Sequence, residues 1–122
     1  MAEDFWPANI AESSLVTPVS ILREQAALLG EKTKQLIKGE VQTSSNGNLL
    51  VHSFAVVAPT LGYRYELFSV QHTATFYPLV VRFAGNPTQV MSEDEFKSKL
   101  KEILAAPQTV NVVHSILAQV RS

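Results

Sequence analysis

The dipeptide Asn46-Gly47 constrains the fold of this chain more than any other feature of its sequence. Both residues accept the positive φ angles that a two-residue β-hairpin turn requires. Val41 and Thr43 alternate with polar residues before the turn, and a run rich in β-forming residues extends from Leu49 to Ala58 after it. Alternation of this kind is typical of a strand with one buried face. The sequence therefore predicts an antiparallel hairpin over residues 40–58.

Two further strands are predicted after this hairpin. Pro59-Thr60-Leu61-Gly62 has the composition of a turn, Tyr63 to Gln71 has the pattern of a strand, and Thr75 to Phe83 forms another strand after a further turn. Pro78 cannot donate a hydrogen bond to a β-ladder, so this last strand is expected at an edge or with a bulge. The short connections predict a four-stranded antiparallel meander that ends at Gly85-Asn86-Pro87.

Helices are predicted on both sides of the meander. Thr17-Pro18 combines a good N-cap with a residue suited to the first helical position, and Gly39 is a natural end for that helix. Ser92-Glu93-Asp94-Glu95 is a capping box that begins a second helix. Pro107 ends the second helix, and residues 107–120 continue with helical spacing of their apolar side chains.

The chain is expected to be a single domain, residues 1–122, of the α+β class in the order α-β-β-β-β-α-α. Its length is enough for one core without cross-links. Residues 1–16 are expected to be an irregular lead-in that contains Phe5-Trp6-Pro7. Two interpretations of this tripeptide are open: an aromatic anchor that ties the terminus to the body, or a recognition peptide. We favour the anchor, because large aromatic side chains near a terminus are usually buried.

The composition narrows the classes of partner. The chain has no cysteine, which excludes disulfides, thiolate chemistry and cysteine-based zinc sites. Its net charge of −1 lacks the basic excess of nucleic-acid-binding proteins. No apolar run is long enough to span a bilayer, and Met1-Ala2-Glu3-Asp4 is acidic where a secretory signal would be basic. We expect a cytoplasmic protein with neither a nucleic-acid nor a membrane partner.

The predicted hairpin registers pair Thr43 with Leu50, Val41 with His52, Val56 with Tyr65, Phe54 with Leu67, Leu67 with Val80 and Tyr65 with Arg82. They divide the strand side chains between two sheet faces, because side chains alternate across a strand. The first face is almost uncharged, should be covered by helices, and carries Val41, Thr43, Leu50, Phe54, Val56, Tyr65, Leu67, Phe76 and Val80. The second face is polar at one end, with Glu40, Gln42, Ser53, Ala55, Arg64 and Glu66, and apolar at the other, with Val51, Phe68, Val70, Tyr77, Leu79, Val81 and Phe83. An apolar patch of this size is expected to be covered by a terminal segment, to form a dimer interface or to bind another partner.

Few groups in the sequence are suited to catalysis. His52 and His72 are expected on opposite faces of adjacent strands, where they cannot share a metal, and His114 lies apart in the last helix. No phosphate-binding glycine loop, nucleophile elbow or HExxH motif occurs. Arg64 and Glu66 are interpreted as an exposed charged pair, with an active-site pair as the alternative. We therefore expect neither a metal nor a cofactor.

These observations favour a small non-catalytic protein-interaction domain of an adaptor, chaperone-like or immunity type. It would bind itself, as a homodimer, or another protein through the second sheet face or through the edge strand that contains Pro78. The predicted contact residues are Arg64, Glu66, Phe68, Val70, Tyr77, Leu79 and Val81. The alternative is a small enzyme or ligand-binding domain, with a polar site where Arg64, Glu66 and Tyr77 converge.

Overall fold

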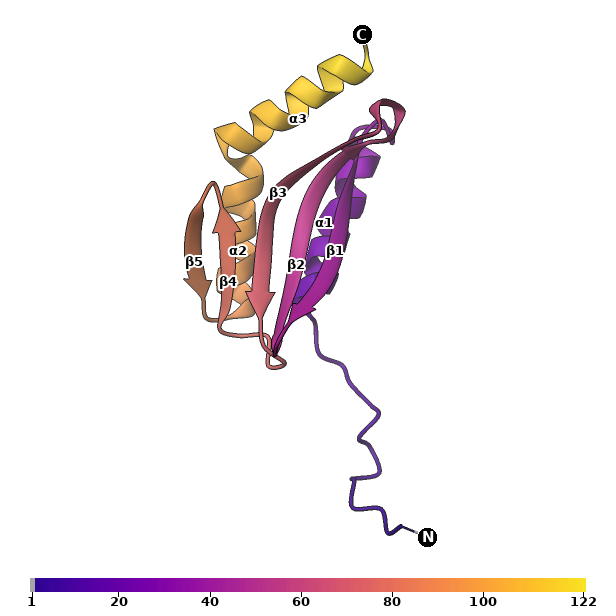
Figure 1. The fold of residues 1–122 in the computed structure, drawn as a ribbon, viewed down its shortest axis with the longest axis vertical. Coiled ribbons are helices and arrows are strands. Elements are labelled where there is room, and N and C mark those ends of the chain that lie inside the picture. Colours follow the sequence, from indigo (N-terminus) through magenta and orange to yellow (C-terminus); the bar gives the residue numbers. More distant parts are fainter. Residues whose placement is uncertain (1) are drawn as a thin grey trace.

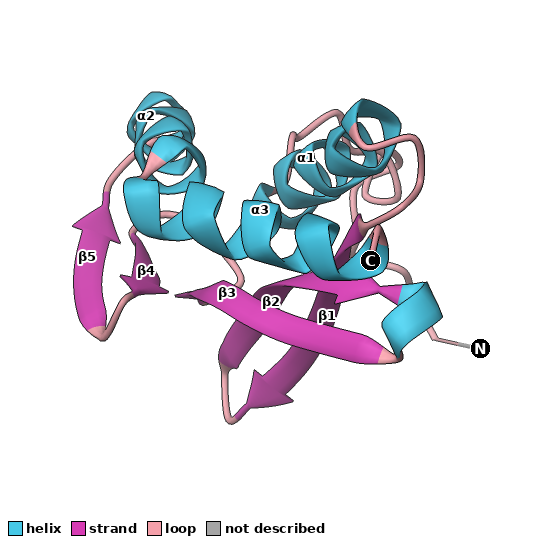
Figure 2. Ribbon diagram, turned by 90° about the horizontal axis from the view of Figure 1, so that it is seen from above, coloured by secondary structure: helices cyan, strands magenta, loops and turns pink. Residues whose placement is uncertain are grey.

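Helices cover one face of a five-stranded antiparallel sheet in the computed structural model, which describes residues 2–122 (Figure 1, Figure 2). Consecutive strands are neighbours throughout, so the predicted α+β class and the antiparallel meander are confirmed. The elements are α1 (Pro18–Lys32), β1 (Lys38–Asn46), β2 (Leu49–Ala58), the 3-10 helix η1 (Pro59–Leu61), β3 (Tyr63–His72), β4 (Leu79–Phe83), β5 (Asn86–Val90), α2 (Glu93–Ala105) and α3 (Pro107–Val120).

The prediction of four strands was wrong by one, because the meander does not stop at Gly85-Asn86-Pro87. Ala84 and Gly85 have φ angles of 54° and 79° and form a tight turn, after which the chain returns as β5 beside β4. Pro87 is tolerated there because β5 is an edge strand, in which one row of N–H groups needs no partner. The predicted fourth strand begins only at Leu79, directly after Pro78.

The two edges of the sheet differ in length and composition. β5 is five residues long and contains a proline, whereas β1 at the opposite edge is nine residues long and contains none. A short edge strand with a proline is a poor partner for another strand. The β1 edge is the one at which backbone N–H and C=O groups are open along a longer stretch.

The first helix ends at Lys32 and not, as predicted, at Gly39. Thr33 is its C-cap, and positive φ angles at Lys34 and Gln35 turn the chain back toward the sheet. Gly39 lies in β1 instead, where a Cβ atom would sit 2.5 Å from the Cα atom of Ala26 in α1. The glycine is therefore required by the close approach of a strand and a helix.

The other predicted helix signals are confirmed. The Thr17 hydroxyl accepts a hydrogen bond from the Ser20 N–H at 3.1 Å and caps α1. The Ser92 hydroxyl accepts from the Glu95 N–H at 3.2 Å, as a capping box requires. Residues 107–120 form the helix α3.

A bulge in β3 decides which side chains face the helices. Val56 pairs with Tyr65 as predicted, but Phe54 pairs with Phe68 because Leu67 is an extra residue in β3. Since side chains alternate along a strand, one inserted residue reverses the direction of all those that follow it. Phe68 and the alternate residues after it therefore point toward the helices.

The core lies between the sheet and the helical layer and has two parts. In the first part α1 and α2 pack on the sheet through Ile21, Leu22, Ala26, Phe54, Phe68, Val70, Leu79, Val81, Val90, Phe96, Leu100 and Ile103. In the second part α3 contributes Ile116, which packs near Ile37, Val56 and Ala58. All three helices lie on one side of the sheet, which leaves its other face free (Figure 2).

Candidate functional site

Four of the predicted contact residues lie in the core and not on the free face of the sheet. Phe68, Val70, Leu79 and Val81 are at most 3% exposed beneath the helices. Their assignment to the second face was wrong, because the Leu67 bulge shifts the β3 register and the β4 register shifts with it. In this fold these side chains stabilise the core and are not available to a partner at the sheet surface.

The three residues of the alternative polar site do not converge. Arg64 lies on the free face and forms an ion pair with Glu40, with 3.1 Å between Nε and Oε1. Glu66 lies on the same face, whereas Tyr77 packs against the core on the helix side. The Tyr77 hydroxyl is buried without a hydrogen-bond partner among residues 2–122. Burial, and secondarily the carboxylate of Glu93, raises the pKa of Tyr77 above its ordinary value.

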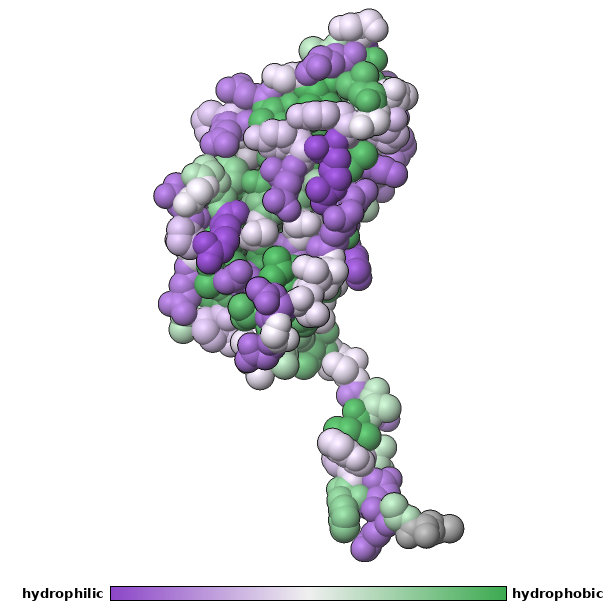
Figure 3. Space-filling model, in the orientation of Figure 1, coloured by the Kyte–Doolittle hydropathy of each residue, from purple (hydrophilic) through white to green (hydrophobic). Residues whose placement is uncertain are grey.

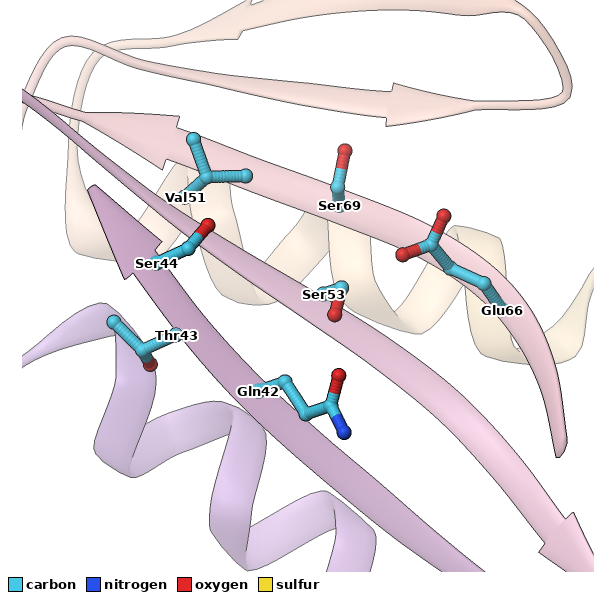
Figure 4. A pocket seen from close by; sticks show the side chains of 7 residues that line it. All are labelled: Gln42, Thr43, Ser44, Val51, Ser53, Glu66 and Ser69. Carbon is cyan, nitrogen blue, oxygen red and sulfur yellow. The ribbon is translucent and has the colours of Figure 1, made fainter. Parts of the chain in front are cut away.

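The free face of the sheet is polar and hollowed. Its hollow has a volume of about 560 Å³ and is lined by Gln42, Thr43, Ser44, Val51, Ser53, Glu66 and Ser69 (Figure 4). Hydroxyl and amide groups from three adjacent strands dominate this surface, and Glu66 is the one carboxylate that lines it. The predicted polar end of the second face is therefore present, but the predicted apolar patch beside it is not.

His52 and His72 form a buried pair that the sequence analysis did not predict. They lie on the same face of neighbouring strands, with 2.9 Å between their Nε2 atoms. Both are less than 5% exposed. The expectation that they face opposite sides was wrong for the same reason as the core assignment, because the bulge reverses the alternation of β3 before His72.

When both rings are neutral, the hydrogen bonds of the pair fix the positions of its protons. The carbonyl oxygen of Thr73 can only accept, so Nδ1 of His72 carries a proton and its Nε2 is free to accept from His52. Nδ1 of His52 then accepts from the Thr43 hydroxyl at 2.9 Å. Burial, followed by the effects of His72 and Arg23, lowers the pKa of His52 from 6.5 to about 4. With both rings neutral, every ring nitrogen of the pair therefore has a hydrogen-bond partner.

Residues 2–16 form an N-terminal arm that extends away from the body (Figure 1, Figure 3). Its hydrogen bonds, within the described part of the chain, join only its own residues. Five large apolar side chains on it are more than half exposed: Phe5, Trp6, Ile10, Leu15 and Val16. The predicted anchor was therefore wrong, since Phe5 is 87% and Trp6 is 71% exposed.

An apolar groove runs between α1 and the α2–α3 pair on the opposite side of the molecule from the polar hollow. We call it the helix groove; its volume is about 260 Å³, and it is lined by Gln25, Leu28, Leu29, Lys32, Phe54, Leu104 and Val113. Leu28 is 41% exposed there. This groove could not be predicted from the sequence, because its residues come from elements far apart in the chain.

Residues 2–122 contain no group of three or more histidine, aspartate or glutamate side chains placed to hold a metal ion. No single helix in this part of the chain is long and apolar enough to span a membrane; only α2 and α3 together, across a bend of 52°, reach that length and composition. No protein-family model, no curated protein and no solved structure matches the chain.

Proposed function

We propose that this chain is a small non-catalytic interaction protein that binds a protein partner through its N-terminal arm. The exposure of five large apolar side chains on one short segment carries the proposal. Single exposed apolar residues are ordinary on protein surfaces, but a contiguous group marks a site that binds another surface. Trp6 and Phe5 are also residue types that supply much binding energy at interfaces.

The ionisable groups of the body support a non-catalytic role. Arg64 and Glu40 satisfy each other on the surface, and His52 and His72 form a closed network with Thr43 and the backbone. A catalytic acid or base needs a reacting group within hydrogen-bond distance in an accessible cleft. The histidine pair lies in the core, where both rings are shielded from solvent.

Removal of the two aromatic side chains of the arm tests this proposal. The double variant Phe5→Ala/Trp6→Ala should lose the partner that the unmodified chain retains in affinity capture from its native host, or lose self-association measured by light scattering. A matched control is Leu61→Ala/Met91→Ala, which removes two exposed apolar side chains from the body. Equal binding by both double variants would refute the role of the arm.

The polar hollow favours a second candidate function, the binding of a small hydroxyl-rich ligand such as a neutral sugar. Ser44, Ser53, Ser69 and Gln42 offer donors and acceptors from adjacent strands on one surface (Figure 4). Titration of a panel of neutral disaccharides should shift the amide resonances of Ser53 and Ser69 if this function is present. Resonances that stay unchanged at millimolar sugar would remove this candidate.

A further inference from the structure

We infer that the arm of one copy binds in the helix groove of a second copy, so that two chains exchange arms. The inference rests on the proposed function of the arm and adds both the partner and the acceptor surface. In the groove the exposed Leu28 and the half-buried Leu29, Leu104 and Val113 border a recess whose floor is the buried aromatic ring of Phe54. An aromatic side chain of the arm would bury its own surface and that of Leu28 together.

The sizes of the groove and of its occupant agree. The groove volume is about 260 Å³, which is just below the usual range of about 300–1,000 Å³ for ligand pockets. It suits one or two side chains and not a folded surface. Phe5-Trp6-Pro7 provides two large aromatics followed by a proline, which restricts the backbone beside them and lowers the entropy lost on binding.

The charges of the arm and the body are complementary. Residues 2–16 contain three acidic residues, Glu3, Asp4 and Glu12, and no basic ones. Since the chain has 11 acidic and 10 basic residues in all, the remainder of the chain has an excess of two basic residues. Lys32 lines the groove and forms no ion pair within residues 2–122. Its ammonium group can therefore form an ion pair with Glu3 or Asp4 on the arm of the other copy.

The direction of the arm favours a second copy over the chain's own groove. The arm leaves the N-terminal end of α1 and runs away from the body, whereas the groove residues of α1 lie in its second half (Figure 1). Thr17 is extended, with ψ of 152°, as is usual for a residue before proline. The arm would have to reverse its direction before Thr17 to reach its own groove. A facing copy, related by a two-fold axis, receives it without that reversal.

Trp6 makes the inference directly measurable, because it is the only tryptophan in the chain. With rising protein concentration, from about 1 µM to 1 mM, its fluorescence should move to shorter wavelengths as it leaves water. Light scattering should show a change from one to two chains over the same range. Leu28→Glu and, independently, Lys32→Glu should move this transition to at least ~10-fold higher concentration.

Two controls separate binding from misfolding. Ala27→Glu places the same charge on the same helix outside the groove lining, so its transition should match that of the unmodified chain. The full-length double variant Phe5→Ala/Trp6→Ala keeps every residue that lines the groove and has no tryptophan. Added to the Leu28→Glu variant, it should restore the fluorescence shift of that variant's Trp6.

Three results would overturn the inference. The first is a Trp6 spectrum typical of an exposed side chain at every protein concentration. The second is a spectral shift that does not depend on concentration, which would mean that Trp6 binds in the groove of its own chain. The third is failure of the mixed sample to restore the shift. If Trp6 stays exposed in the purified chain while a different protein is captured in a Phe5- and Trp6-dependent way, the arm keeps its proposed function. In that case only the exchange between copies is refuted.

Discussion

His52 and His72 show how two polar residues can be buried at little cost to stability. Each ring nitrogen of the pair has a partner, so the desolvated groups are satisfied as long as both rings are neutral. A proton added to His52 is disfavoured first by burial and then by the charges of His72 and Arg23. The pair is therefore a stabilising feature whose contribution depends on pH.

We predict that acid weakens the fold through His52. The pKa of His52 is 6.5 for an unperturbed histidine, as in the unfolded chain, and about 4 in the folded chain. As the pH falls, the unfolded chain therefore binds the proton first, and this favours unfolding. The free energy of unfolding should fall between pH 6.5 and pH 4, by about 3 kcal/mol in total from this group. Urea unfolding at several pH values measures this change in the free energy of unfolding.

Two variants isolate the contribution of His52 from that of the carboxylates. His52→Gln should be less stable than the parent at neutral pH, yet its stability should depend less on pH between 6.5 and 4. His114→Gln, which changes an exposed histidine outside the pair, is the matched control. Parallel pH profiles for His52→Gln and the parent would contradict the prediction.

At the scale of elements, β4 separates core from surface between adjacent residues. Leu79 lies fully buried beneath the helices, and the next residue, Val80, points to the free face. This is the reverse of the assignment that the predicted register made. Substitutions at these two positions therefore test which side chain lies in the core.

We predict that Leu79→Ala lowers the free energy of unfolding by about 2–5 kcal/mol, because it leaves a cavity in a packed core. Val80→Ala removes a smaller side chain from a partly solvated face and should cost less than ~1 kcal/mol. Equilibrium urea unfolding of the two variants gives both values. A loss for Val80→Ala that equals or exceeds the loss for Leu79→Ala would show that the predicted register was the correct one.

Elements that depend on neighbouring residues were predictable from the sequence. Thr17, Ser92 and the turn after Asn46 act within a few positions of themselves, and each is present. The turn itself falls one residue later than predicted, at Gly47-Asn48, which moves each partner by two positions and keeps the face. Local chemistry therefore determines most element boundaries in this chain.

The register of β3 was not predictable in the same way. The bulge at Leu67 carries neither glycine nor proline. It lies between Tyr65, which packs in the second part of the core, and Phe68, which packs in the first part. Because alternation transmits a one-residue shift along the strand, this single error exchanged the predicted contact residues with the core. The helix groove and the histidine pair were missed for a related reason, since both arise only when distant elements are brought together.

At the scale of the whole molecule, the arm and the body behave as separate parts. The arm contributes no hydrogen bond to the body within residues 2–122, and its largest side chains are exposed. Phe5-Trp6-Pro7 was recognisable in the sequence as an unusual segment. Its position relative to the body could not be predicted. An anchor packs on the surface of the body, whereas a recognition segment does not, and the sequence alone does not distinguish the two.

We predict that deletion of residues 2–14 leaves the stability of the isolated body unchanged. At low concentration, where copies do not associate, the midpoint of thermal unfolding should stay within ~2 °C of the parent value, because no core contact is removed. Far-ultraviolet circular dichroism follows the transition. A midpoint of thermal unfolding that is lower by many degrees would support the anchor interpretation, since it would mean that the arm packs on the body.

The unequal edges of the sheet limit how this protein can aggregate. A strand from another molecule can pair along the open edge of β1, but the short, proline-containing β5 offers no equivalent edge. Fibre growth by strand addition needs two receptive edges on every molecule, one to join the fibre and one to extend it. With one receptive edge, two molecules that pair in this way consume it, and the stack ends there.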